Sequence, residues 1–94
     1  MKKIIDEISQ ASEIGNREDR IEAVKAIGIN TKIAPQIAYL ITIMKFRDAE
    51  DGIGIAIDGD DIEIYGKTYD LRNRIKDAGF AWMPLAKVWR RKNG

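Results

Sequence analysis

The C-terminal third of the chain interleaves cations with aromatic rings. Residues 65–94 contain eight basic and two acidic residues, a net charge of +6. Residues 1–64 contain eight basic and thirteen acidic residues, a net charge of −5, so the whole chain carries only +1. Five of the seven aromatic residues also lie in this basic segment, namely Tyr65, Tyr69, Phe80, Trp82 and Trp89. Because cations attract phosphates and flat rings stack on bases, this composition indicates nucleic-acid binding, to single strands in particular.

The first element expected to position these groups is a helix that begins at Thr68 as N-cap and ends at Ala78, before Gly79. At ~100° per residue, one face of this helix carries the apolar Leu71, Ile75 and Ala78. The opposite stripe is polar or aromatic and contains no acid: Tyr69, Arg72, Asn73 and Lys76. A solvated face is the ordinary explanation of such a stripe, but the basic hairpin that follows favours a ligand contact.

The second element is a hairpin, with strands over 80–83 and 88–92 around a turn at 84–87. Alternation places Phe80 and Trp82 on one face of the first strand, and Trp89 and Arg91 on one face of the second. Val88, Arg90 and Lys92 then point the other way. We expect Phe80, with Trp82 as a second candidate, in the core, and Tyr69 and Trp89 exposed for stacking. Trp82 is also kept as a candidate contact.

Two motifs resemble catalytic or metal sites but lack the required spacing. Gly66-Lys67-Thr68 follows a strand and opens a helix, but a phosphate-binding P-loop needs glycine where Asp61 stands. The cluster Asp58, Asp60, Asp61 and Glu63 does not have the spacing of a calcium loop. It is better explained as an acidic hairpin tip that keeps a sheet edge from pairing.

Composition excludes several other classes. The chain has no cysteine and no histidine, which removes disulfides, the usual zinc and copper ligands and the commonest general base. We expect no enzyme activity, no cofactor and no metal. No signal peptide or membrane-length apolar run is present, so a cytoplasmic protein is expected. Seventeen isoleucines and only two glutamines fit a thermophile, and A/T-rich codon bias explains them equally well.

The remaining chain predicts helices followed by a hairpin. Apolar spacing indicates one helix over 3–14, a second capped by Asn16 and ending at Gly28, and a third capped by Thr31 with Pro35 in its first turn. The third helix is apolar around much of its circumference over 37–44, which favours a central position or a homodimer interface. Ile53–Ile57 and Ile62–Ile64 alternate around Asp58-Gly59-Asp60, which predicts a hairpin. The expected fold is α+β in one domain, with helices in 1–47, a seam at 47–52, and β-β-α-β-β order in 52–94.

The C-terminal segment also resembles a known family. Its pattern runs G-K-T-Y-x-x-R-x-x-I-K-x-x-G-F-x-W-x-P-x-x-K-x-W, from Gly66 to Trp89. This is similar to a small α/β module of phage and archaeal DNA-associated proteins, and to the C-terminal half of the archaeal single-stranded DNA-binding proteins of the ThermoDBP type. The resemblance implies helices beside a small antiparallel sheet, oligomerisation, and a cleft of aromatic and basic side chains for single-stranded DNA. The contact residues that the resemblance implies are Trp82, Lys87 and Trp89, and more weakly Tyr69, Arg72 and Lys76.

Together these observations predict a non-enzymatic protein that binds single-stranded DNA or RNA with low sequence specificity, and that forms a homodimer. The candidate contact residues are Lys67, Tyr69, Arg72, Lys76, Trp82, Lys87, Trp89, Arg90 and Arg91. Two alternatives stay open, which are a protein–protein interaction module and a protein that binds duplex DNA or structured RNA.

Overall fold

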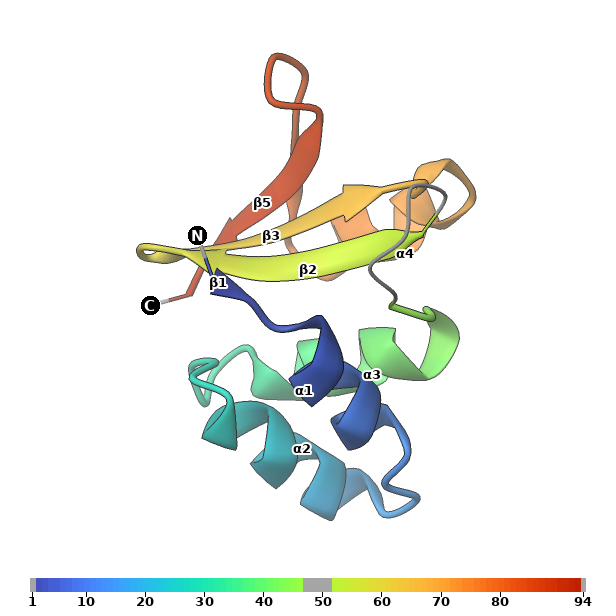
Figure 1. Cartoon of the computed structure of the whole chain (residues 1–94), viewed down its shortest axis with the longest axis vertical. Helices are drawn as coiled ribbons and strands as arrows, with labels where there is room; N and C mark the ends of the chain where they lie inside the picture. Colours follow the sequence, from blue (N-terminus) through green and yellow to red (C-terminus); the bar gives the residue numbers. More distant parts are fainter. Residues whose placement is uncertain (1, 47–51, 94) are drawn as a thin grey trace.

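The computed structural model describes residues 2–46 and 52–93 and shows helices packed on one face of a five-stranded antiparallel sheet (Figure 1). The strand order is β1-β2-β3-β5-β4. The predicted α+β class is confirmed. The elements, in chain order, are β1 (Lys2–Lys3), α1 (Ile5–Ser12), α2 (Arg17–Ala26), α3 (Ala34–Ile43), β2 (Ile53–Asp58), β3 (Asp61–Gly66), the 3-10 helix η1 (Tyr69–Leu71), α4 (Arg72–Asp77), β4 (Ala81–Met83) and β5 (Val88–Lys92).

Strand β1 was not predicted, because the sequence indicated helix from residue 3. Lys2 and Lys3 pair with Ile57 and Ala56 of β2, and the Ile4 N–H donates to the Ile55 carbonyl at 3.1 Å. A strand of two residues has no periodicity, so only its neighbour identifies it. Helix α1 therefore begins two residues later than expected, and it buries Ile5, Ile8 and Ala11.

The next two helices test the predicted caps. The Asn16 side chain accepts the Asp19 N–H at 3.1 Å, so the predicted cap of α2 is confirmed. The Thr31 cap is wrong, because α3 begins after Ile33 and no side chain caps it. Asn30 shapes the turn before α3 instead. Its side chain accepts the Lys32 N–H at 2.8 Å, and its carbonyl accepts the Ala34 N–H at 2.9 Å. Such a local side-chain bond offers the backbone an alternative to a helix start at Thr31.

Helix α3 lies at the centre of the core. Ile37, Leu40 and Ile41 are at most 2% exposed and belong to the same buried cluster as Ile64 and Trp89. The apolar residues that favoured a homodimer interface are therefore mostly buried within the chain itself. The large apolar side chains that α3 leaves exposed are Tyr39, at 49%, and Ile43, at 37%.

The second half follows the predicted order with one change. The two-residue turn Gly59-Asp60 joins β2 to β3, as Asp58-Gly59-Asp60 predicted. The expected helix over 68–78 divides into η1 and α4, and the Thr68 side chain caps neither. Gly79, at φ 90°, ends the helical segment as predicted, since few other residues adopt that angle. Strands β4 and β5 form the predicted last hairpin.

The boundary expected at 47–52, between the helical part and the β-β-α-β-β part, lies outside the described residues except for Gly52. Among the described residues, no helix is long and apolar enough to cross a membrane.

Candidate functional site

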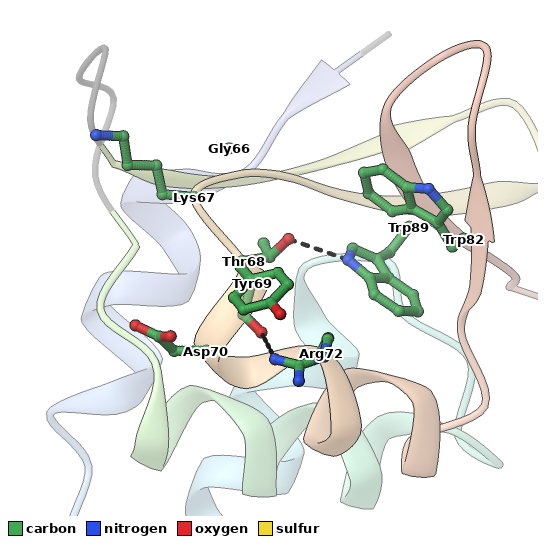
Figure 2. Close-up of a pocket in the computed structure, with 8 residues that line it drawn as sticks. All are labelled: Gly66, Lys67, Thr68, Tyr69, Asp70, Arg72, Trp82 and Trp89. Carbon is green, nitrogen blue, oxygen red and sulfur yellow. Dashed lines mark hydrogen bonds between the residues drawn. The ribbon is translucent and has the colours of Figure 1, made fainter.

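One cleft gathers most of the predicted contact residues. It has a volume of about 650 Å³ and lies where β3 leads into η1, opposite the β4–β5 hairpin (Figure 2). We call it the aromatic cleft and define it by its lining residues, which are Gly66, Lys67, Thr68, Tyr69, Asp70, Arg72, Trp82 and Trp89. Five of the nine predicted contacts, Lys67, Tyr69, Arg72, Trp82 and Trp89, are therefore in one place.

Trp89 forms the floor of the cleft. It pairs with Ile64 of β3, is only 9% exposed, and donates its indole Nε1–H to the Thr68 hydroxyl at 3.0 Å. Thr68 is itself buried, at 5% exposed, so this bond satisfies two polar groups that water does not reach. Trp89 was expected to be exposed, and that expectation is wrong. Thr68, which we had taken as a helix cap, orients the buried indole instead.

Trp82 is the exposed wall of the cleft. It is 45% exposed and pairs across the hairpin with Trp89, with ring centroids 5.3 Å apart and planes tilted by 57°. Its alternative assignment to the core is therefore wrong, whereas Phe80, at 3% exposed, is in the core as predicted. The two residues have different neighbours, because Phe80 precedes β4 and belongs to the core cluster with Ile75 of α4, whereas Trp82 pairs with Trp89 at the cleft. The Phe80 N–H is bonded to the Ile75 carbonyl of α4, which keeps Phe80 with the helices.

Tyr69 and Arg72 form a stacked pair on the opposite side of the cleft. Tyr69 is 73% exposed, and the Arg72 guanidinium carbon lies 4.0 Å from the centre of its ring. Arg72 Nη1 also donates to the Tyr69 carbonyl at 2.7 Å (Figure 2). The two contacts hold the guanidinium over a ring at the cleft surface, which is the geometry of a cation–π pair. The pair offers both a flat surface and a positive charge to a ligand.

The rim of the cleft carries Lys67 and Asp70, whose side chains point away from the two tryptophans in Figure 2. Gly66 has φ 98°, and a Cβ there would collide with the Gly52 carbonyl oxygen. The Lys67 N–H donates to the same oxygen at 3.2 Å. Gly66-Lys67-Thr68 is thus a tight strand end in which the Lys67 and Thr68 amides bond backbone carbonyls. This agrees with our interpretation that it is no phosphate loop.

Two predicted cations are exposed but lie outside the aromatic cleft. Lys76 is exposed on α4, one turn beyond Arg72. Lys87 is exposed in the β4–β5 turn, where it has a positive φ of 55° and donates its N–H to the Met83 carbonyl at 2.8 Å. Both lie on elements that border the cleft.

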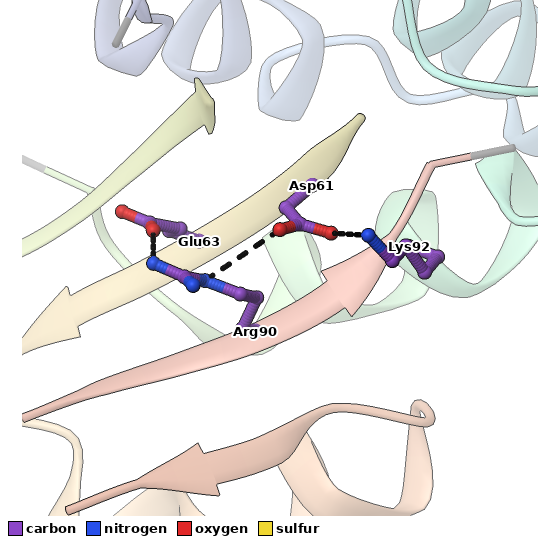
Figure 3. Close-up of polar contacts among 4 residues, drawn as sticks. All are labelled: Asp61, Glu63, Arg90 and Lys92. Atoms are coloured by element: carbon purple, nitrogen blue, oxygen red, sulfur yellow. Dashed lines mark hydrogen bonds and ion pairs between the residues drawn. The ribbon is translucent and has the colours of Figure 1, made fainter. Parts of the chain in front are cut away.

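Arg90 belongs to a separate charged network on the other face of the sheet (Figure 3). Its guanidinium bonds the Glu63 carboxylate, and its Nε lies 3.8 Å from Asp61 Oδ2. Lys92 Nζ lies 3.1 Å from Asp61 Oδ1. We call Asp61, Glu63, Arg90 and Lys92 the β3–β5 ion network. The Glu63 hydrogen bond, more than the charges of Glu63 and Asp61, raises the pKa of Arg90 above its ordinary value, so Arg90 stays charged at every accessible pH.

The ion network changes the interpretation of two predictions. Arg90 was expected to contact phosphate, but it bonds a carboxylate that is only 5% exposed. Register explains this pairing, because Glu63 and Arg90 are direct cross-strand partners, as are Asp61 and Lys92. The acids expected to form a solvated hairpin tip are thus partly used in ion pairs, while Asp58 and Asp60 stay exposed.

Arg91 has a structural role on the helix side of the sheet. Its Nη1 donates to the side chain of Gln36 on α3 and to the carbonyl of Ala78 at the end of α4. A cation at a helix C-terminus complements the partial negative charge there. Arg91 therefore ties β5 to two helices, away from the aromatic cleft, and no phosphate contact is assigned to it.

Comparison of the chain with models of protein families, with curated proteins and with solved structures found no match.

Proposed function

We propose that the protein binds single-stranded nucleic acid, without catalysing a reaction, through the aromatic cleft. One observation carries the proposal, which is that two exposed rings, Tyr69 and Trp82, line a single cleft together with the stacked Arg72 guanidinium. Rings that face water at a cleft are positioned to stack on bases, and each such contact contributes about 1–3 kcal/mol. Every base has a flat face, so low sequence specificity follows.

The floor of the cleft supports this role. Trp89 lies against Trp82 and is held by its bond to Thr68, so the exposed ring leans on a ring with a defined orientation. A ring that is ordered before binding loses less conformational freedom when a base stacks on it. Trp89 therefore supports the contact and does not itself make one.

Four exposed cations around the cleft are available for phosphates, namely Lys67, Arg72, Lys76 and Lys87. Within residues 2–46 and 52–93, none of these four forms an ion pair. Phosphate contacts of this kind add affinity that falls as salt rises, with a slope of about 0.7 per contact for single strands. The ThermoDBP-type resemblance agrees with the proposal, since Trp82 and Lys87 belong to its pattern. It also implies a homodimer.

The test is a titration of a fluorescent oligothymidylate at two salt concentrations, with wild type and Trp82→Ala. We expect salt-sensitive binding by wild type and a loss of about 5-fold or more in Trp82→Ala, because stacking on one base is lost. Leu85→Ala is the matched control, since Leu85 is fully exposed in the same hairpin but does not line the cleft.

Three outcomes would contradict the proposal. They are no binding at low salt, binding indifferent to salt, and equal losses in Trp82→Ala and Leu85→Ala. Tighter binding of a duplex or a structured RNA of the same length would favour the alternative nucleic-acid ligand.

A further inference from the structure

A third exposed ring, besides Tyr69 and Trp82, lies at a depression separate from the aromatic cleft. Tyr39 is 49% exposed on α3, a helix whose other large side chains are mostly buried. Its hydroxyl accepts a hydrogen bond from Arg74 Nη1 of α4 at 2.6 Å. The bond fixes the ring in place and holds a guanidinium beside it.

Tyr39 also borders its own depression. This depression has a volume of about 410 Å³, and its lining includes Arg17, Gln36, Tyr39, Arg74 and Asp77. Two cations face one carboxylate there, so the charge favours an anionic ligand. A ring next to a cation repeats the combination that Tyr69 and Arg72 present in the aromatic cleft.

Helix α4 connects the two places. Arg72, Asn73 and Arg74 are consecutive and all exposed, and at ~100° per residue they spread over about 200° of the helix circumference. Arg72 lies at the aromatic cleft, Arg74 lies at the Tyr39 depression, and Asn73 lies between them. The path crosses one helix, a width of about 10–12 Å. The two nearest acids lie outside these three residues, Asp70 in the lining of the cleft and Asp77 in the lining of the depression.

We infer that Tyr39 and Arg74 form a second contact for the same strand, so that a bound single strand leaves the aromatic cleft, crosses α4 over Arg72–Arg74 and stacks a further base on Tyr39. This inference rests on the proposed function. It adds a requirement for length, since a strand of a few nucleotides fills the aromatic cleft and only a longer one reaches Tyr39.

The test compares fluorescent oligothymidylates of roughly 4 and roughly 12 nucleotides by anisotropy. Tyr39→Leu removes the aromatic face and keeps an apolar side chain of similar size, so the fold is retained, and circular dichroism checks it. We expect Tyr39→Leu to weaken binding of the long oligonucleotide by about 5-fold or more and to leave the short one unchanged. Tyr39→Phe keeps the ring and loses only the hydroxyl that bonds Arg74, so it should weaken binding of the long oligonucleotide much less than Tyr39→Leu does. Ile43→Ala, one turn along the same helix, is the matched control and should change neither.

Charge provides an independent measurement. Arg74→Gln should reduce the salt slope for the long oligonucleotide by about 0.7 and leave the slope for the short one unchanged.

The outcomes separate this inference from the proposed function. If wild type binds both oligonucleotides but Tyr39→Leu binds the long one like wild type, the second contact is wrong and the aromatic cleft stands. Equal weakening for both lengths would also overturn it, because Tyr39 would then act through the fold. If wild type binds neither oligonucleotide, both proposals fail, and the exposed rings would point to a protein partner.

Discussion

Trp89 and Arg90 are neighbours in β5, and they belong to two regions that use similar side chains differently. On one face of the sheet, the aromatic cleft brings the exposed Tyr69 and Trp82 next to Arg72, and the Arg72 guanidinium stacks on a ring. On the other face, the β3–β5 ion network pairs Arg90 with Glu63, and Lys92 with Asp61. A cation stacked on a ring keeps its charge available to a phosphate, whereas a cation bonded to a carboxylate does not. A count of basic residues therefore overestimates the number of cations that remain free of a carboxylate.

The two tryptophans of the aromatic cleft also differ from each other, in burial and in hydrogen bonding. Trp89 is buried and bonded to Thr68, whereas Trp82 is 45% exposed and covers it. One ring contributes to stability and the other is available for a ligand.

The largest effect is expected from Trp89→Ala. Removing a buried indole leaves a cavity and should lower the free energy of unfolding by about 3–5 kcal/mol, measured by urea denaturation. Trp82→Ala is the matched change on the exposed ring and should cost much less, since part of its surface already faces water. Equal losses in the two variants would show that the structural and contact roles are not divided between these rings.

Thr68→Val keeps the shape of the side chain and removes the acceptor of the Trp89 indole N–H. A buried donor without a partner costs about 1–3 kcal/mol, so the unfolding midpoint in urea should fall. Thr68→Ser keeps a hydroxyl, so its unfolding midpoint in urea should fall less. A Thr68→Val variant as stable as wild type would show that the indole bond has no net effect.

Removing the acids of the β3–β5 ion network should free its two cations to bind phosphate. Asp61→Asn with Glu63→Gln removes both carboxylates, so that Arg90 and Lys92 become free to contact phosphates. Affinity for an oligothymidylate should rise at low salt, and the salt slope should steepen by up to about 0.7 for each freed cation that reaches the strand. Asp58→Asn with Asp60→Asn, at two exposed positions of the same hairpin, controls for the change of two charges. An unchanged slope in the Asp61→Asn and Glu63→Gln double variant would mean that this face lies away from the bound strand.

The smallest perturbation uses the two rings as their own probes. In Trp89→Phe the remaining tryptophan fluorescence comes from the exposed Trp82. Acrylamide should quench this fluorescence readily, and adding an oligonucleotide should change its intensity. In Trp82→Phe the emission of buried Trp89 should lie at shorter wavelength and resist quenching. The reverse pattern would overturn the assignment of floor and wall.

Local features of the chain were predictable because they depend on neighbours in sequence. Alternation predicted β2 and β3, Asp58-Gly59-Asp60 predicted their turn, and Gly79 predicted the end of the helical segment. Alternation also predicted that Trp89 and Arg90 point to opposite faces, as they do. Thr31 and Thr68 failed as caps, because Asn30 shapes the turn before α3 and Trp89 uses the Thr68 hydroxyl.

Composition and local spacing were enough to predict the α+β class, the basic aromatic character of residues 65–94 and the presence of Tyr69, Arg72 and Trp82 in one segment. Which tryptophan is exposed, and which cations are free of carboxylates, depends on tertiary packing. Periodicity assigned Phe80 and Trp82 to one face, but burial depends on what packs against that face at each residue, and only Phe80 joins the core cluster with Ile75 of α4. Likewise, Arg90 meets Glu63 because β5 pairs with β3, and the partner of a strand is a long-range choice that local spacing does not encode.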